Sequence, residues 1–293
     1  MSLSASATPK ITDYDLLEKL GSGSYATVYK AKHRQSSTYH AIKCVLKSSL
    51  SNTSTDNLVT EIKLLKSLKN KFIVGLDDFF WDDKKIYIVL EYCNAGNLSN
   101  FIKSKKALPE STCKYFLRQL AIAVQYMRSN DISHFDLKPQ NLLLTRTANN
   151  VLLKVADFGF AQHLKLGEIN FTLKGSPLYM APEIISKQQY DATADLWSIG
   201  VILYECLFGK APYSSKTIDE LLFKIRNHER IAIPSNTRIS DDCHDFLARL
   251  LQHNPKKRIT FQEFFEHNFL DLKTFPTDGV GILGYKNVYF IFI

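Results

Sequence analysis

The sequence predicts an α+β protein of two lobes, in which an antiparallel sheet with one key helix precedes a larger, mainly helical lobe. From Tyr14 to Leu46, apolar and polar residues alternate with the period of two that is typical of strands. Beyond Asn94 the pattern becomes helical. The stretch from Leu196 to Phe208 is apolar nearly all round, which predicts a helix through the centre of the larger lobe.

The small lobe is predicted to begin with three short antiparallel strands, because the alternating segments are interrupted by G-S-G-S and R-Q-S-S-T. A helix follows, and residues spaced three and four apart give it one inward face. That face consists of Leu58, Glu61, Leu65 and Leu68. Two more strands are expected over 73–80 and 85–92.

The larger lobe is predicted to contain a helix that starts at Pro109 and Glu110. Its buried stripe consists of Phe116, Leu120, Ala123 and Met127. The change of pattern places the boundary between the lobes near 92–96. We therefore assign 1–13 to a flexible segment, 14–270 to one domain with lobes 14–93 and 94–270, and 271–293 to an unassigned tail.

Composition narrows the class of protein. With 293 residues, 45% hydrophobic and 23% charged, the chain has the balance of a soluble globular protein. The net charge is +8, but the basic residues are dispersed, so we expect no nucleic-acid partner. Five scattered cysteines without a C-x-x-C predict reduced thiols. Since no signal sequence or membrane-spanning run is found, we expect a cytoplasmic protein without a transmembrane segment.

A carboxylate on the inward face of the first helix needs an explanation. Glu61 lies between two leucines, where an unpaired charge is costly. Either the helix turns so that Glu61 reaches water, or a buried cation neutralises it. Lys43 is the candidate cation, because it shares a strand face with Ala41 and Val45. We expect the pair, since buried charges seldom lack partners.

The turn Gly21-Ser22-Gly23-Ser24-Tyr25-Ala26 lies between two predicted strands. Its glycines would let the backbone approach a phosphate closely, although a simple hairpin turn explains them equally well. No G-K-[ST] and no helix follow, which disfavours a P-loop or Rossmann site.

The stretch H-F-D-L-K-P-Q-N is more specific. Asp136 could accept a proton from a hydroxyl group, Lys138 could neutralise a transferring phosphoryl group, and Asn141 could bind a metal. Asp157, in D-F-G after an apolar strand, supplies a second oxygen ligand of the kind that suits Mg²⁺. Any one of these residues could be a simple turn or cap, but that explanation does not account for all of them in this order.

Taken together, these motifs resemble those of eukaryotic protein kinases. The matching elements are the Gly-rich loop, the A-I-K strand, the catalytic loop, D-F-G and A-P-E, over about residues 14–270. Lys138-Pro139 and G-S-P-L-Y-M-A-P-E resemble serine/threonine kinases. The stretches L-G-S-G-S-Y-A-T-V-Y-K-A and D-F-G-F-A-Q-H resemble the Unc-fifty-one-like kinases of autophagy and Hedgehog signalling.

The resemblance implies a bilobal protein-kinase fold and a role for each matching residue. Asp136 would be the base, Lys138, Lys43 and Glu61 would complete the catalytic set, and Asn141 with Asp157 would bind Mg²⁺. ATP would be bound by Leu20, Gly21, Ser22, Gly23, Ser24, Tyr25, Ala26, Val28, Ala41, Lys43, Leu90, Glu91, Cys93 and Leu143. Structural roles are implied for Asp195, which braces the catalytic loop, and for a Glu183–Arg258 ion pair.

Two positions depart from the family pattern. Ala26 replaces the third glycine of the loop, which is a mild change. Phe135 replaces the arginine that normally pairs with a phosphorylated activation loop and takes no part in the chemistry. The tail, which ends in V-Y-F-I-F-I, matches no known pattern.

We therefore expect a monomeric kinase domain that uses ATP and Mg²⁺ to phosphorylate serine and threonine in protein substrates, with regulatory protein partners. The alternative is a pseudokinase, a binding scaffold that keeps the fold without the transfer. Lys43, Glu61, Asp136, Asn141 and Asp157 are all present, which favours the enzyme.

Overall fold

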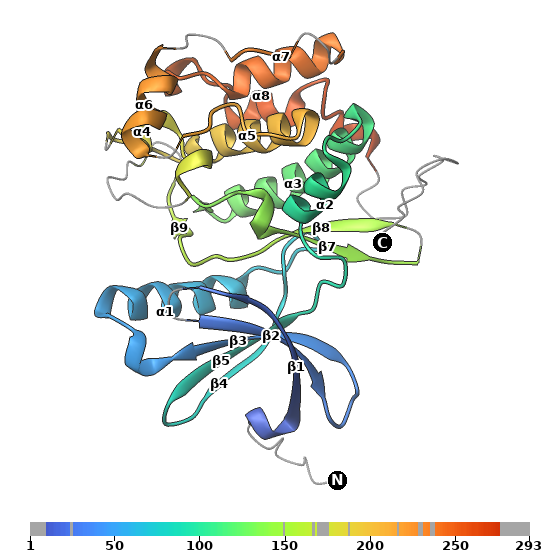
Figure 1. Ribbon diagram of the computed structural model, residues 1–293, viewed down its shortest axis with the longest axis vertical. Coiled ribbons are helices and arrows are strands. Elements are labelled where there is room, and N and C mark those ends of the chain that lie inside the picture. Colours follow the sequence, from blue (N-terminus) through green and yellow to red (C-terminus); the bar gives the residue numbers. More distant parts are fainter. Residues whose placement is uncertain are drawn as a thin grey trace.

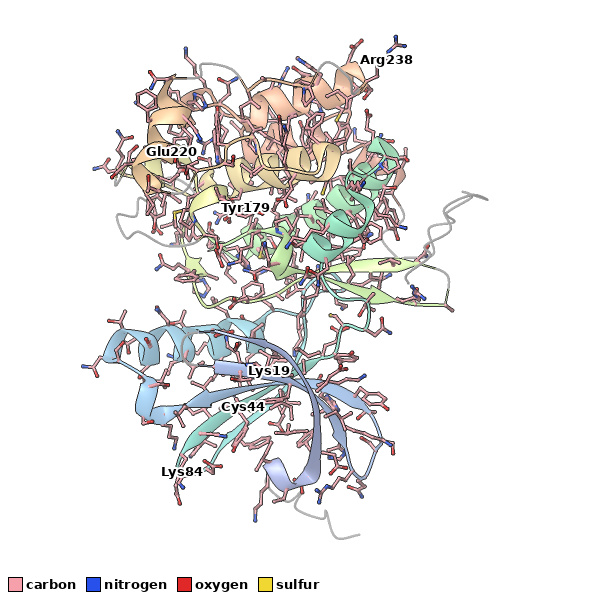
Figure 2. All side chains as sticks on the ribbon, in the orientation of Figure 1. Lys19, Cys44, Lys84, Tyr179, Glu220 and Arg238 are labelled. Atoms are coloured by element: carbon pink, nitrogen blue, oxygen red, sulfur yellow. The ribbon has the colours of Figure 1, made fainter. Side chains whose placement is uncertain are left out.

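The protein folds into the two lobes that the sequence predicts, with a small sheet-containing lobe joined to a larger helical lobe (Figure 1). The computed structural model describes residues 10–23, 26–148, 150–165, 168, 176–186, 188–215, 217–227, 231–234 and 238–275. Cys44 and Lys19 lie in the small-lobe sheet and Lys84 at its far tip, whereas Tyr179 and Glu220 lie in the large lobe (Figure 2).

The small-lobe sheet has five antiparallel strands in the order β1-β2-β3-β5-β4. Its outer face has its own small core, which includes Ile42 and Val89, whereas Val45 and Ile88 on the other face join the main core. The strands are β1 (Tyr14–Ser22), β2 (Ala26–His33), β3 (Tyr39–Leu46), β4 (Leu76–Trp81) and β5 (Lys85–Glu91).

Helix α1 (Asn52–Ser67) covers the inner face of this sheet (Figure 1). Ser51 caps it, because its side chain accepts a hydrogen bond from the N–H of Ser54. The predicted inward face is buried, and it includes Glu61 at 2% exposure. The helix is therefore held by apolar packing around one enclosed carboxylate.

Strand β4 begins at Leu76, three residues later than predicted. The preceding segment instead pairs across the lobes with β8 (Val151–Val155). The N–H of Val74 donates to the carbonyl of Val155 (2.9 Å), and the N–H of Val155 donates to the carbonyl of Phe72 (2.8 Å). Local sequence could not show this difference, because the backbone partner lies about eighty residues further along the chain.

The large lobe packs its helices around α5 (Ala194–Phe208), which is buried along nearly its whole length. It ends where predicted, at Gly209, whose φ is +73° and whose added Cβ would lie 1.8 Å from the carbonyl oxygen of Lys106. Only glycine fits there. The other helices of this lobe are α2 (Leu98–Lys105), α3 (Glu110–Ser129), α4 (Pro182–Ile185), α6 (Ile218–Asn227), α7 (Asp241–Leu250) and α8 (Phe261–Glu266).

Two further sheets of two strands each lie in the large lobe, near its junction with the small lobe. Strand β7 (Leu142–Arg146) pairs with β8, and β6 (Ile132–Ser133) pairs with β9 (Gln162–His163). The catalytic loop, 134–141, follows β6, and the D-F-G segment, 157–159, follows β8. None of the helices in the described ranges is long and apolar enough to cross a membrane.

A buried ion pair joins α4 to the segment that follows α7 in the large lobe. This contact is the one expected from the sequence. The guanidinium of Arg258 donates to both carboxylate oxygens of Glu183, at 2.7 and 2.9 Å. Arg258 also donates to the carbonyls of Thr193 and Gln252 and lies over the ring of Trp197. With so many partners, this arginine has a structural role.

Candidate active site

Lys43 and Glu61 meet across the inner face of the small lobe. The ammonium of Lys43 donates to both oxygens of Glu61, at 2.7 and 2.8 Å, so the expected contact is present. Burial raises the pKa of the Glu61 carboxyl, and the nearby charge of Lys43 opposes this. The pair fixes α1 against the sheet and orients the ammonium.

Asp157 brings a second carboxylate to the same ammonium. Its Oδ1 lies 3.8 Å from Lys43 Nζ, and its side chain is 47% exposed. Its φ is +63°, in a backbone region that residues other than glycine seldom adopt. The next residue, Phe158, is fully buried and packs edge-on against the ring of His134. The buried phenyl ring thereby fixes the strained backbone of Asp157, which keeps its carboxylate beside Lys43.

Asp195, at the start of α5, anchors the catalytic loop through hydrogen bonds to its backbone. Its two carboxylate oxygens accept the N–H groups of His134 and Phe135, each at 2.8 Å. These two bonds hold Phe135 at a φ of +60°. Its ring is 4% exposed and packs edge-on against Tyr190, so apolar packing stands here in place of the family's arginine.

Asp136 is buried and surrounded by hydrogen-bond donors. Its carboxylate accepts from Lys138 Nζ (2.7 Å), Ser176 Oγ (2.9 Å) and Asn141 Nδ2 (3.0 Å). Lys138 also donates to Ser176 Oγ, at 2.6 Å. A hydroxyl group is thus already placed against the carboxylate, with a cation beside it.

Asn141 and Asp157 are the residues whose chemistry fits a magnesium ion. The amide nitrogen of Asn141 is committed to the carbonyl and carboxylate of Asp136, which leaves its side-chain oxygen as the donor atom for a metal. Asp157 adds a carboxylate that is open to solvent. Two oxygen donors, with room for water and phosphate oxygens, suit Mg²⁺ better than a softer ion.

The Gly-rich turn forms the outer edge of the site. Strand pairing continues through Gly21 opposite Val28, and the N–H of Gly23 donates to the carbonyl of Ala26 (2.8 Å). A Cβ added at Gly21 or Gly23 would meet no atom within 4 Å. Packing therefore does not require glycine at either position. Ser24 and Tyr25 lie outside the described residues.

Several of the remaining predicted nucleotide contacts lie near the end of β5, where the chain leads into the large lobe. Ala41 lies opposite Leu90 in the sheet, and Leu143 of β7 forms a bridge with Asn97. Burial raises the pKa of the Cys93 thiol to about 11, so it stays protonated at neutral pH. Ala41, Leu90 and Leu143 supply apolar side chains of the kind that a flat aromatic ring would need.

Sequence reasoning missed two contacts of this region. Ser176, which reaches Asp136, lies forty positions further along the chain. Lys154 reaches Glu91 (2.9 Å) from within an apolar strand. A lone charge in V-L-L-K-V-A was a signal for the second contact, whereas the first had none.

Comparison with known proteins agrees with this geometry. The family model described as the protein kinase domain matches residues 14–270. The chain belongs to the protein kinase family. That membership confirms the predicted fold and the resemblance stated from the motifs.

Individual relatives narrow the group. The chain is 51% identical over 272 residues to serine/threonine-protein kinase ULK3 of Xenopus laevis, covering 92% of this chain and 58% of the relative. It is 48% identical over 270 residues to ULK3 of Homo sapiens, covering 92% and 57%. It is 42% identical over 261 residues to ATG1c of Arabidopsis thaliana, covering 89% and 36%. The motif stretches resemble the third Unc-fifty-one-like kinase most, which agrees with these names.

The chain spans less than two thirds of the length of these relatives. What the similarity covers is the kinase domain.

Proposed function

We propose that this chain is a serine/threonine protein kinase, which transfers the γ-phosphoryl group of ATP to serine and threonine hydroxyls of protein substrates. The observation that carries the proposal is the hydrogen-bonded group around Asp136, where Lys138, Asn141 and a serine hydroxyl converge within 3.0 Å. The names of its relatives, serine/threonine-protein kinases, support the same class of acceptor.

In this proposal Asp136 accepts the hydrogen bond of the incoming hydroxyl and takes its proton as the oxygen attacks the γ-phosphorus. The bond from that phosphorus to the bridging oxygen of the β-phosphate breaks, and ADP leaves. The contact from Ser176 Oγ, at 2.9 Å, is a hydroxyl in the geometry that such an acceptor would need. Lys138 lies 2.7 Å from the same carboxylate, from where its ammonium can stabilise charge on the transferring group.

The nucleotide is held from the opposite side. Lys43, fixed by Glu61, would present its ammonium to the α- and β-phosphates, and the backbone of the Gly-rich turn would cover them. Asn141 and Asp157 would hold Mg²⁺, which would supply positive charge to neutralise the phosphates. Catalysis then rests on positioning and electrostatics, since phosphoryl transfer needs no covalent intermediate with the protein.

The rest of the assignment follows from the resemblance and from similarity to its relatives. We propose that residues 14–270 form one catalytic domain, that it works as a monomer in the cytoplasm with regulatory protein partners, and that it acts in autophagy or Hedgehog-type signalling.

The rival function is a pseudokinase scaffold. A transfer assay with radiolabelled ATP and Mg²⁺ on a mixed protein substrate separates the two, with Asp136→Asn as the matched inactive control. We expect label on phosphoserine or phosphothreonine with the unmodified protein, and a loss of two or more orders of magnitude with the variant, as for other essential catalytic groups. Equal, background-level labelling by both proteins would favour the scaffold.

A further inference from the structure

Lys154 is a buried ammonium group outside the residues assigned to the transfer. It lies on β8, three positions before Asp157, and is 7% exposed. Its Nζ donates to the carbonyl oxygen of Lys71 (2.7 Å) and pairs with Glu91 Oε2 (2.9 Å). Lys71 follows α1 and Glu91 ends β5, so both partners belong to the small lobe. One side chain of the large lobe therefore binds two segments of the small lobe.

The position of Lys154 in its hairpin places it next to the proposed nucleotide site. Lys154 lies opposite Leu143 in the β7–β8 ladder, and directly opposite residues share one face of a sheet. Leu143 is among the residues assigned to the nucleotide. The ammonium therefore lies beside the floor of the site, where it can affect the hinge without touching a ligand.

Glu91, the last residue of β5, is the group on which Lys154 acts. Its N–H donates to the carbonyl of Gly75 (2.9 Å), and its Oε2 accepts the N–H of the same residue (3.3 Å). The side chain of Glu91 is thus fixed at the back of the hinge, while its backbone is assigned to adenine. A displacement of the carboxylate would move those backbone groups.

We propose that Lys154 is a positioning residue, which fixes the hinge at Glu91 through an ion pair between the lobes and thereby sets the affinity for the adenine nucleotide. This inference rests on the proposed function. Removal of the ammonium would take one donor from the Glu91 carboxylate, which keeps the N–H of Gly75, and one from the Lys71 carbonyl, and the hinge would shift. The group around Asp136 shares none of these contacts, so the transfer step would keep its geometry.

The expected result is a split between the two kinetic constants. Lys154→Met should weaken binding of Mg-ADP and raise KM for ATP about tenfold, the equivalent of one ordinary polar contact. Its kcat should stay within about threefold of the unmodified protein. Glu91→Gln, which keeps an acceptor for Gly75, should weaken Mg-ADP binding to a similar extent. The double variant should bind Mg-ADP no more weakly than either single variant, because both substitutions remove the same ion pair.

The experiment measures Mg-ADP dissociation constants by titration calorimetry, together with KM and kcat for ATP. Lys103→Met, at an exposed position on α2, is the matched control and should bind as the unmodified protein does. Unchanged ADP affinity in Lys154→Met overturns the inference, and so do single effects that add fully in the double variant. If Lys154→Met does not fold, unchanged affinity in Glu91→Gln overturns it equally. An unmodified protein that binds ADP but transfers no phosphate contradicts the proposed function alone.

Discussion

The two lobes each contain a buried ion pair, and the pairs differ in what else touches them. Arg258 is fully enclosed, with Glu183, two backbone carbonyls and an indole ring around its guanidinium. Lys43 is held by Glu61 on one side, and the half-exposed Asp157 lies 3.8 Å away on the other.

The difference shows how one chemistry serves two purposes. A cation whose donors are all used within the fold can only hold the fold together. A cation that is fixed on one side and open toward a solvent-exposed carboxylate is oriented for a ligand that arrives later. From these surroundings we expect Arg258 to contribute stability, and we propose nucleotide binding for Lys43.

Arg258→Met tests the first half of this comparison and should have the largest effect on stability. Truncating one partner of a buried pair typically costs about 3–5 kcal/mol, because the other charge is left unpaired. We expect a large fall in the denaturant midpoint, measured by circular dichroism, with activity lost only in proportion to the unfolded fraction. A midpoint unchanged from that of the unmodified protein would show that Glu183 finds another partner.

Lys43→Met tests the second half. Losing one such electrostatic contact costs about 3–4 kcal/mol of transition-state stabilisation, or roughly 100- to 1000-fold in rate. The domain should still fold, as judged by its circular dichroism spectrum and thermal transition. Near-normal turnover in the labelled-ATP assay would remove Lys43 from the catalytic set.

A third prediction concerns a place where charge is absent. Kinases that require arginine upstream of the target use acidic residues there, and the matching positions here are Asn97 and Gln140. Pro177 and Met180, with Leu173 outside the described residues, should favour an apolar residue after the target. On a peptide array we expect about a tenfold preference for apolar over charged residues at that position, and none for arginine three residues upstream. Strong selection for the upstream arginine would refute this.

The smallest effect is expected at the activation loop. A phosphate on Thr172 would normally pair with the arginine that Phe135 replaces. Phe135 is instead packed on Tyr190, and a pair with an exposed lysine such as Lys165 is worth only about 0–1 kcal/mol. Thr172 and Lys174 lie outside the described residues.

We therefore expect Thr172→Ala and phosphatase-treated enzyme to keep substantial activity at saturating Mg-ATP, with control exerted by partners or regions outside this chain. Untreated enzyme is the reference. A drop of about a hundredfold in both preparations, the size of a lost catalytic contact, would mean that the loop still depends on its phosphate.

Much of the fold was predictable because the signals were local. A glutamate on an apolar helix face and a lysine of matching strand parity were enough to predict the contact between Lys43 and Glu61. The end of α5 followed from Gly209, whose left-handed backbone excludes other residues. The roles of the site residues themselves remain a proposal.

The rest depended on contacts between distant segments. The start of β4 was wrong by three residues because Val74 bonds to Val155 across the lobes. Ser176 donates a hydrogen bond to Asp136 from 40 positions further along the chain. Arg118 donates one to Asp271, which lies 153 positions further along. Such contacts leave no periodic pattern in either segment, so a single sequence does not show them.

The most direct test of the comparison measures thermal stability and phosphate transfer per folded molecule in Lys43→Met and Arg258→Met side by side. We predict opposite profiles. Lys43→Met should melt near the unmodified protein and be roughly 100- to 1000-fold slower. Arg258→Met should melt far lower and keep nearly normal activity per folded molecule. If the two variants lose stability and transfer to the same extent, the surroundings of the two pairs do not separate their roles.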